Sequence, residues 1–216
     1  TYGLRLDIPI FPTAPEENPL VSQYLPGYST SNVPTGNLLW SPRVGFNWDV
    51  SGDRTTQVRG GIGIFTGRPA YVWISNNYGN NGLLTAEVSA FSSTLPFRAD
   101  PNNQYYPGDH PSLGAPTVKS EIDLADPDLK MPQLLRYNVC VDQELPWGFV
   151  GTAEVLYSQS INDLLYKNLN LKAATGTVAA LGSGVDGRPI YGGTESYNNS
   201  FNDIMYLYNT SDGYQY

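Results

Sequence analysis

The sequence predicts an all-β fold, part of a transmembrane antiparallel up-and-down β-barrel with long extracellular loops and short periplasmic turns. Three observations predict it: segments in which polar and apolar residues alternate, connections that are long and short in turn, and a composition with 15% charged residues, 16 Tyr, 22 Gly and 17 Pro. Strand side chains project alternately to two faces, so each such segment has one apolar and one polar face. A barrel wall between lipid and water needs this pattern.

The stretch SPRVGFNWDVSGDRTTQVRGGIGIF contains the clearest alternation. A polar tract, 51–55, separates its two alternating halves, and this arrangement predicts a hairpin with a tight turn. In a barrel wall we expect these side chains to face lipid: Val44, Phe46, Trp48, Val58, Ile62 and Ile64. We expect these side chains to line the lumen: Arg43, Asn47, Asp49, Gln57 and Arg59.

Alternation also predicts strands at 2–8, 135–143 and 149–158, and a further strand beginning within 213–216. Long and short connections then follow one another along the chain: 9–42, 51–55, 66–134, 143–148 and 159–212. Outer-membrane barrels have short periplasmic turns and long extracellular loops, whereas a soluble sandwich has no reason to keep this order.

Aromatic residues lie at or near the ends of the predicted strands: Trp40, Trp48, Trp147 and Tyr157. Aromatic girdles at the two membrane interfaces would place rings there, and an aromatic-rich soluble core is the alternative. We expect the chain to be part of a longer polypeptide, because it begins TYGLRLDIPIF inside one alternating segment and ends SDGYQY as another begins.

The net charge of −8 and the single cysteine exclude two classes of protein. An acidic surface repels phosphate backbones, so we expect no nucleic-acid partner. Cys140 has no second cysteine to pair with, which excludes a scaffold held by internal disulfides.

Extended stretches carry a resemblance to a known family: TYGLRLDIPIFP, LLWSPRVGFNWDVSGDRTTQVRGGIGIFTGRPAYVWISNNYGN, DPDLKMPQLLRYNVCVDQELPWGFVGTAEVLYSQSINDLLYKNLNL and NTSDGYQY. The sequence resembles the barrel region of TonB-dependent outer-membrane receptors of the Oar-like group, which often carry an N-terminal carboxypeptidase-regulatory-like domain. The resemblance is weakest in 83–120 and 172–200.

The resemblance implies a barrel of about 22 strands closed by a plug domain and energised by TonB. Residues 1–216 would be a middle part of that barrel, without the plug or the remaining strands. The implied partners are outer-membrane lipid, the plug and remaining strands, TonB through the full-length protein, and an unknown extracellular ligand. Gly60, Gly61 and Gly63 would let the plug approach or the strand bend.

Candidate ligand-binding residues are aromatic and lie in the long segment 66–134: Tyr71, Trp73, Tyr78, Tyr105 and Tyr106. Such rings stack on sugars or grip peptides, and they equally pack loops against each other. Asp123, Asp126 and Asp128 form a weak calcium candidate, although the EF-hand spacing and its glycine are absent. The alternative for these carboxylates is a solvated acidic loop.

We expect neither catalysis nor a cofactor. His110 and Cys140 lack the partners of a triad or an activated thiolate, and RGGIGIFTG fits neither common phosphate-loop spacing. The function that the sequence predicts is a segment of an outer-membrane receptor or transporter for uptake or surface binding. The alternative is a secreted structural or adhesive β protein that self-associates through strand edges.

Overall fold

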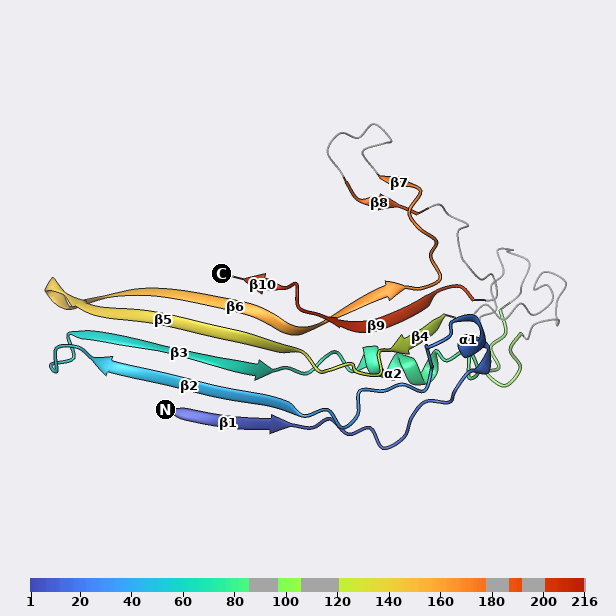
Figure 1. The fold of residues 1–216 in the computed structure, drawn as a ribbon, viewed down its shortest axis with the longest axis horizontal. Coiled ribbons are helices and arrows are strands. Elements are labelled where there is room, and N and C mark those ends of the chain that lie inside the picture. Colours follow the sequence, from blue (N-terminus) through green and yellow to red (C-terminus); the bar gives the residue numbers. More distant parts are fainter. Residues whose placement is uncertain (86–96, 106–120, 178–186, 192–200, 216) are drawn as a thin grey trace.

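The computed structural model describes residues 1–85, 97–105, 121–177, 187–191 and 201–215 (Figure 1). The strands are β1 (Tyr2–Asp7), β2 (Leu39–Asp49), β3 (Thr56–Thr66), β4 (Ile122–Ala125), β5 (Gln133–Leu145), β6 (Phe149–Asn168), β7 (Gly176–Thr177), β8 (Pro189–Ile190), β9 (Ile204–Thr210) and β10 (Tyr214–Gln215). The helices are α1 (Pro19–Tyr24) and α2 (Val72–Gly79). No helix among the described residues is long and apolar enough to cross a membrane.

One 8-stranded sheet contains most of the strands, in the order β1-β2-β3-β5-β6-β9-β4, with β10 also paired to β6. Neighbours from β1 to β9 are antiparallel, and among the described strands of this sheet only β4 and β9 pair in parallel. In Figure 1 the short turns lie at one end of the long strands and the long connections at the other. The predicted up-and-down order and the alternation of short and long connections are therefore confirmed.

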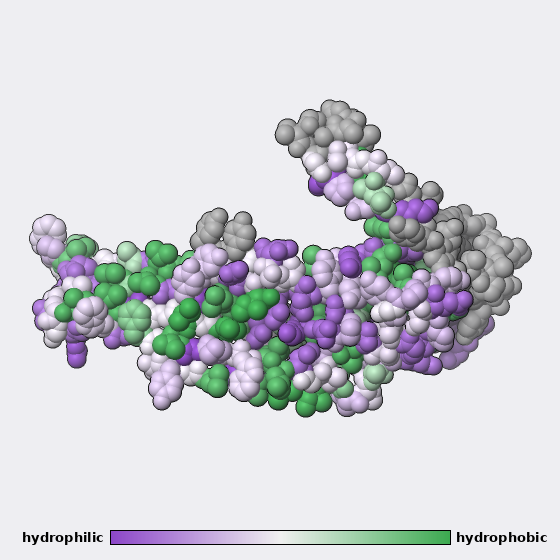
Figure 2. All heavy atoms as spheres, viewed as in Figure 1, coloured by the Kyte–Doolittle hydropathy of each residue, from purple (hydrophilic) through white to green (hydrophobic). Residues whose placement is uncertain are grey.

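The register of β2 against β3 keeps the predicted apolar residues on one face. Val44 pairs with Ile62, and Trp48 pairs with Val58. The row continues through Tyr137 of β5, which pairs with Ile62 and whose ring stacks on that of Tyr157. Side chains on this apolar face are exposed on several strands. Their exposed fractions include 57% for Val44, 60% for Trp48, 50% for Val139 and 73% for Val155. Figure 2 shows hydrophobic patches along the long strands. An apolar face without a protein cover is what a lipid-facing wall requires.

Two tryptophans mark the ends of this apolar face on β2. Trp40 and Trp48 share the face and are 51% and 60% exposed. They are eight positions apart in the sequence, which is roughly 26 Å along a strand at about 3.3 Å per residue. The apolar band of outer-membrane barrels is about 25 Å tall, so the spacing fits two aromatic girdles.

The turn between β2 and β3 is organised by Asp49. Its carboxylate accepts the backbone N–H groups of Gly52 and Arg54, which both have positive φ (79° and 68°). The hydroxyls of Ser51 and Thr55 donate to Asp53 in the same turn, and these hydrogen bonds hold the pKa of Asp53 at about 2. The polar tract therefore forms its turn through side-chain bonds to its own backbone.

The end of the sheet opposite the short turns is a folded cap, defined here as α1, α2, β4, β9, residues 163–168 of β6 and the described residues that join them. The sequence predicted long connections here. Strand β6 extends ten residues beyond its predicted end at Ser158, and its last residues pair with β9. The stretch 204–210 is one strand between β6 and β4, which corrects the expectation of a loop in 159–212.

Three buried clusters hold the cap together. The largest joins Val21 of α1 to Ile122 and Leu124 of β4 and to Ile204 of β9, all at most 1% exposed. All four residues of β4 are buried, so this strand is covered on both faces. Alternation could not reveal such a strand, because alternation reports strands with one solvent or lipid face.

Candidate functional site

The polar face of the sheet carries side chains that bind one another across β3, β5 and β6. Arg59 Nε donates to Asp142 Oδ2 at 2.8 Å, and the Thr152 hydroxyl donates to the other carboxylate oxygen at 2.7 Å. Asn138 Nδ2 donates to Glu154 Oε1 at 2.8 Å. The predicted polar face is therefore cross-linked by side-chain hydrogen bonds from strand to strand.

Cys140 lies on this polar face, because it pairs directly with Arg59. Its side chain is buried, and its Sγ is 3.8 Å from Asp142 Oδ1. A buried thiol beside a carboxylate lacks the access that a reactive cysteine needs, and the neighbouring Arg59 is already paired with Asp142.

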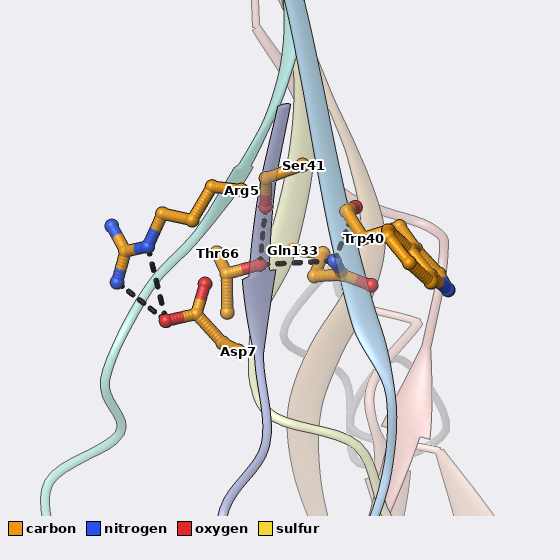
Figure 3. Close-up of polar contacts among 6 residues, drawn as sticks. All are labelled: Arg5, Asp7, Trp40, Ser41, Thr66 and Gln133. Carbon is orange, nitrogen blue, oxygen red and sulfur yellow. Dashed lines mark hydrogen bonds and ion pairs between the residues drawn. The ribbon is translucent and has the colours of Figure 1, made fainter. Parts of the chain in front are cut away.

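Figure 3 shows the polar contacts where the long strands enter the cap. Gln133 Nε2 donates to Thr66 Oγ1 at 3.0 Å and to the Trp40 carbonyl at 3.2 Å. The hydroxyls of Ser41 and Thr66 lie 2.8 Å apart, and Asn162 Nδ2 donates to Gln133 Oε1 at 3.0 Å. These bonds fix β2, β3, β5 and β6 to one another directly below the cap.

An ion pair lies beside this cluster on β1. Arg5 donates through Nε and Nη2 to Asp7 Oδ1, at 3.0 and 2.6 Å (Figure 3). The other carboxylate oxygen, Asp7 Oδ2, is buried and has no hydrogen-bond partner. A buried acceptor without a donor costs stability, so Oδ2 is suited to receive a donor from a bound group.

A cavity of about 140 Å³ lies against this ion pair. It is lined by Arg5, Asp7, Ile8, Pro9, Leu39, Thr66, Gly67, Arg68, Pro69, Tyr71 and Met131. Arg68 is exposed and forms no ion pair with any described residue. The cavity therefore combines apolar walls with both signs of charge and one of the predicted aromatic residues.

The structure brings three of the predicted ligand-binding residues onto or beside one helix. Tyr71 precedes α2 and is 56% exposed. Trp73 packs edge-on against Tyr166, 6.1 Å between ring centroids, and its carbonyl accepts the Tyr166 hydroxyl. The Tyr78 hydroxyl donates to the Thr13 carbonyl at 2.6 Å. Trp73 and Tyr78 therefore serve packing, and Tyr71 alone of the three lines the cavity.

The other two predicted aromatics lie elsewhere. The guanidinium carbon of Arg98 lies over the Tyr105 ring, 3.7 Å from the centroid of that ring. Tyr106 lies outside the described residues. The aromatic set therefore does not form one surface in the part of the chain that the structure describes.

Two of the three aspartates of the calcium candidate, Asp123 and Asp126, accept hydrogen bonds from other side chains. Asp123 is 2% exposed and accepts Asn80 Nδ2 at 2.8 Å. Asp126 accepts the Asp128 N–H and, at 2.7 Å, the Tyr206 hydroxyl. Across the described ranges, no group of three or more His, Cys, Asp or Glu side chains could hold a metal ion. The geometry gives the calcium hypothesis no support.

Burial in the cap perturbs its titratable groups. Desolvation raises the pKa of the Asp123 carboxyl, against the hydrogen bond from Asn80. Desolvation, with the nearby charges of Asp123 and Glu121, raises the pKa of Tyr166 to about 12. Desolvation and the bond to Asp126 also raise the pKa of Tyr206. The cap is therefore a solvent-excluding structure around ionisable side chains.

The outer membrane beta barrel domain family matches residues 8–216, nearly the whole chain. The chain belongs to this family. No curated protein and no solved structure matches it. Membership places the protein in the bacterial outer membrane, so its apolar face contacts lipid and its polar face lines the interior of the barrel. The cap and the 140 Å³ cavity stand at the end with the long connections.

The sequence did not single out Arg5, Asp7 or Arg68 of the barrel protein as site residues. Arg5 and Asp7 are two residues apart in a strand, so they share a face, and this spacing was the available signal. Arg68 follows β3 in an irregular segment, and no periodicity marks its position.

Proposed function

We propose that the chain forms part of the wall and the outer cap of a TonB-dependent receptor of the Oar-like group, which binds an extracellular ligand for uptake or surface binding. The proposal assigns no catalytic role to the chain. The resemblance of extended stretches to that group supports the receptor type. The observation that carries a binding role is the folded cap, because long connections with a buried core give a rigid outer surface.

The cavity at the cap supports a point of first contact. Tyr71 offers an exposed ring, Asp7 Oδ2 lacks a donor, and Arg68 lacks a counter-ion among the described residues. Convergent polar groups beside apolar walls are typical of ligand sites. The outer-membrane location goes against the alternative of a secreted adhesive protein.

The test uses the full-length receptor that contains this chain. Purified receptor should retain the periplasmic domain of TonB in a pull-down, and cells with the receptor should lose energised uptake of its ligand when TonB is deleted. A receptor that neither binds TonB nor changes uptake on TonB deletion would refute the assignment to TonB-dependent receptors. The location in the outer membrane would stand in either case.

A further inference from the structure

A second cavity, of about 280 Å³, opens on the lumenal face below the cap. It is lined by Thr1, Tyr2, Gly3, Arg43, Val44, Gly45, Gly61, Ile62, Gly63, Phe65, Arg136 and Asn138. Two arginines line it, and no carboxylate does. In a chain of net charge −8, this concentration of positive charge sets the cavity apart.

The register explains how the two arginines face one space. Arg43 of β2 pairs with Gly63 of β3, and Gly63 pairs with Arg136 of β5. The arginines therefore stand on the same face in one row, two strand spacings or roughly 10 Å apart at the backbone. The residue between them has no side chain, so the Arg43 side chain can lie across it at the rim of the cavity.

Packing holds both guanidinium groups in place. The Arg43 side chain lies over Gly63: a Cβ added to Gly63 would be 2.9 Å from the Arg43 Cγ. The Arg43 guanidinium lies 4.4 Å from the centroid of the Phe65 ring. Arg136 Nε donates to Ser158 Oγ at 3.1 Å. Arginines fixed in this way lose little conformational freedom when they bind an anion.

Neither arginine has a counter-ion among the described residues. The ion pairs there join Arg5 to Asp7 and Arg59 to Asp142. Arg43 Nε is buried and has no hydrogen-bond partner. Two neighbouring cations repel each other, and a buried unbonded donor costs stability, so an oxyanion between them removes both costs.

We propose that this cavity binds the carboxylate or phosphate group of a small anionic solute, held between Arg43 and Arg136. Planar guanidinium groups match oxyanions through paired N–H donors. The inference rests on the proposed function in one respect: uptake by the receptor is the reason that a solute enters the lumen. It adds the chemical class of that solute.

Binding is measured by calorimetry with inorganic phosphate on purified full-length receptor in detergent, without TonB. Arg43→Gln and Arg136→Gln should each weaken phosphate binding by roughly tenfold or more, because each removes charge-assisted hydrogen bonds. Arg59→Gln is the matched control: Arg59 is on the same face, is already paired with Asp142, and lies outside the cavity. Its phosphate affinity should equal that of the wild type.

A second variant keeps both charges. Gly45 lines the cavity, and an added Cβ there would have its nearest neighbour at 3.5 Å, an ordinary contact. Gly45→Val should therefore fold, as heat-modifiable migration on gels would show, and should weaken phosphate binding by filling the space. Wild-type affinity in the Gly45 and arginine variants, or equal loss in Arg59→Gln, would overturn the proposal.

Site-resolved labelling with phenylglyoxal identifies what fills the cavity. Arg43 and Arg136 should react in the free receptor and be protected by added phosphate, while exposed Arg54 reacts equally in both samples. Protection without added phosphate would mean that a group of the receptor itself occupies the cavity, and it would overturn the proposal. Because none of these measurements involves TonB or uptake, their failure is distinct from failure of the proposed function.

Discussion

Phe46 of β2 covers Gly60 of β3 on the lipid-facing side of the barrel wall. The two residues are paired in register, and a Cβ added to Gly60 would lie 3.1 Å from the Phe46 ring and 2.6 Å from the Asn138 carbonyl oxygen. An aromatic ring that covers a strand glycine shields its backbone and fixes the register of the two strands. The glycine is therefore a requirement of the wall at this point.

Gly60→Ala should destabilise the barrel by about 1–3 kcal/mol, the usual cost of overpacking. The Asn138 oxygen belongs to the backbone, so it cannot move aside as a flexible side chain would. The measurement is urea unfolding of the full-length protein in detergent. Gly3→Ala is the control, since nothing lies within 4 Å of its added Cβ. Equal stability of both variants would show that Gly60 is not tightly enclosed.

The sequence was sufficient to predict the barrel wall. In β2, β3 and β5 every second side chain faces lipid, so the two environments leave a period of two in the sequence. The cap was not predictable in this way. Ile122 and Leu124 of β4 are buried on one face and Asp123 on the other, so the environment of β4 leaves no alternation.

The candidate site was only partly predictable for a related reason. Tyr71, Trp73 and Tyr78 were grouped by residue type and proximity, but whether a ring faces solvent depends on distant partners such as Tyr166 and Thr13. The pairing of Arg43, Gly63 and Arg136 depends on the register of three strands. Alternation predicts the face of a residue and not its neighbours across the sheet.

Val58→Arg should impair the barrel more than Gln57→Arg. Val58 is on the lipid face opposite Trp48, so it lies at the level of one aromatic girdle, where a charge costs up to about 1 kcal/mol. Gln57 is on the lumenal face and pairs with Asp49 and Asp142, which would accept an arginine. Folded yield in the outer membrane and unfolding in urea both report the difference. Equal losses from the two substitutions would reverse the assignment of the faces.

Asp123→Asn should stabilise the cap at neutral pH and have a smaller effect under acid conditions. Burial raises the pKa of Asp123 above its unfolded value of about 3.9, so the folded protein holds this proton more tightly than the unfolded chain does. The contribution of Asp123 to the stability of the wild type is therefore greatest below the unfolded pKa. This contribution is lost as pH rises through the folded pKa. Asparagine does not titrate and can still accept the bond from Asn80.

Hydrogen exchange of the β4 amides in both proteins, compared from pH 4 to pH 8 after correction for intrinsic rates, measures this effect. The advantage of the variant should grow with pH and level off above the raised pKa. An advantage that grows as pH falls would mean that the Asp123 carboxylate is stabilised in its charged form.

Tyr78→Phe should destabilise the cap, whereas Tyr71→Phe should not. The Tyr78 hydroxyl donates to Thr13 at 2.6 Å, and loss of one such hydrogen bond costs about 0.5–1.5 kcal/mol. Tyr71 is 56% exposed, and surface changes usually stay within about 0.5 kcal/mol. Protease resistance of the cap in intact cells compares the two variants. Equal resistance would remove Tyr78 from the packing role that its contact indicates.

A cysteine introduced at Lys130 should react with a membrane-impermeant maleimide in intact cells, and one at Arg54 should not. Lys130 is an exposed residue of the cap, on the side of the long connections, and Arg54 is exposed in the short turn between β2 and β3. Long connections of outer-membrane barrels face the exterior and short turns face the periplasm. The native Cys140 is buried, so it contributes little background. Arg54→Cys should react once the outer membrane is permeabilised, which shows that its thiol is accessible. Labelling of Arg54→Cys in intact cells together with protection of Lys130→Cys would invert the barrel in the membrane and place the cap and its cavity in the periplasm.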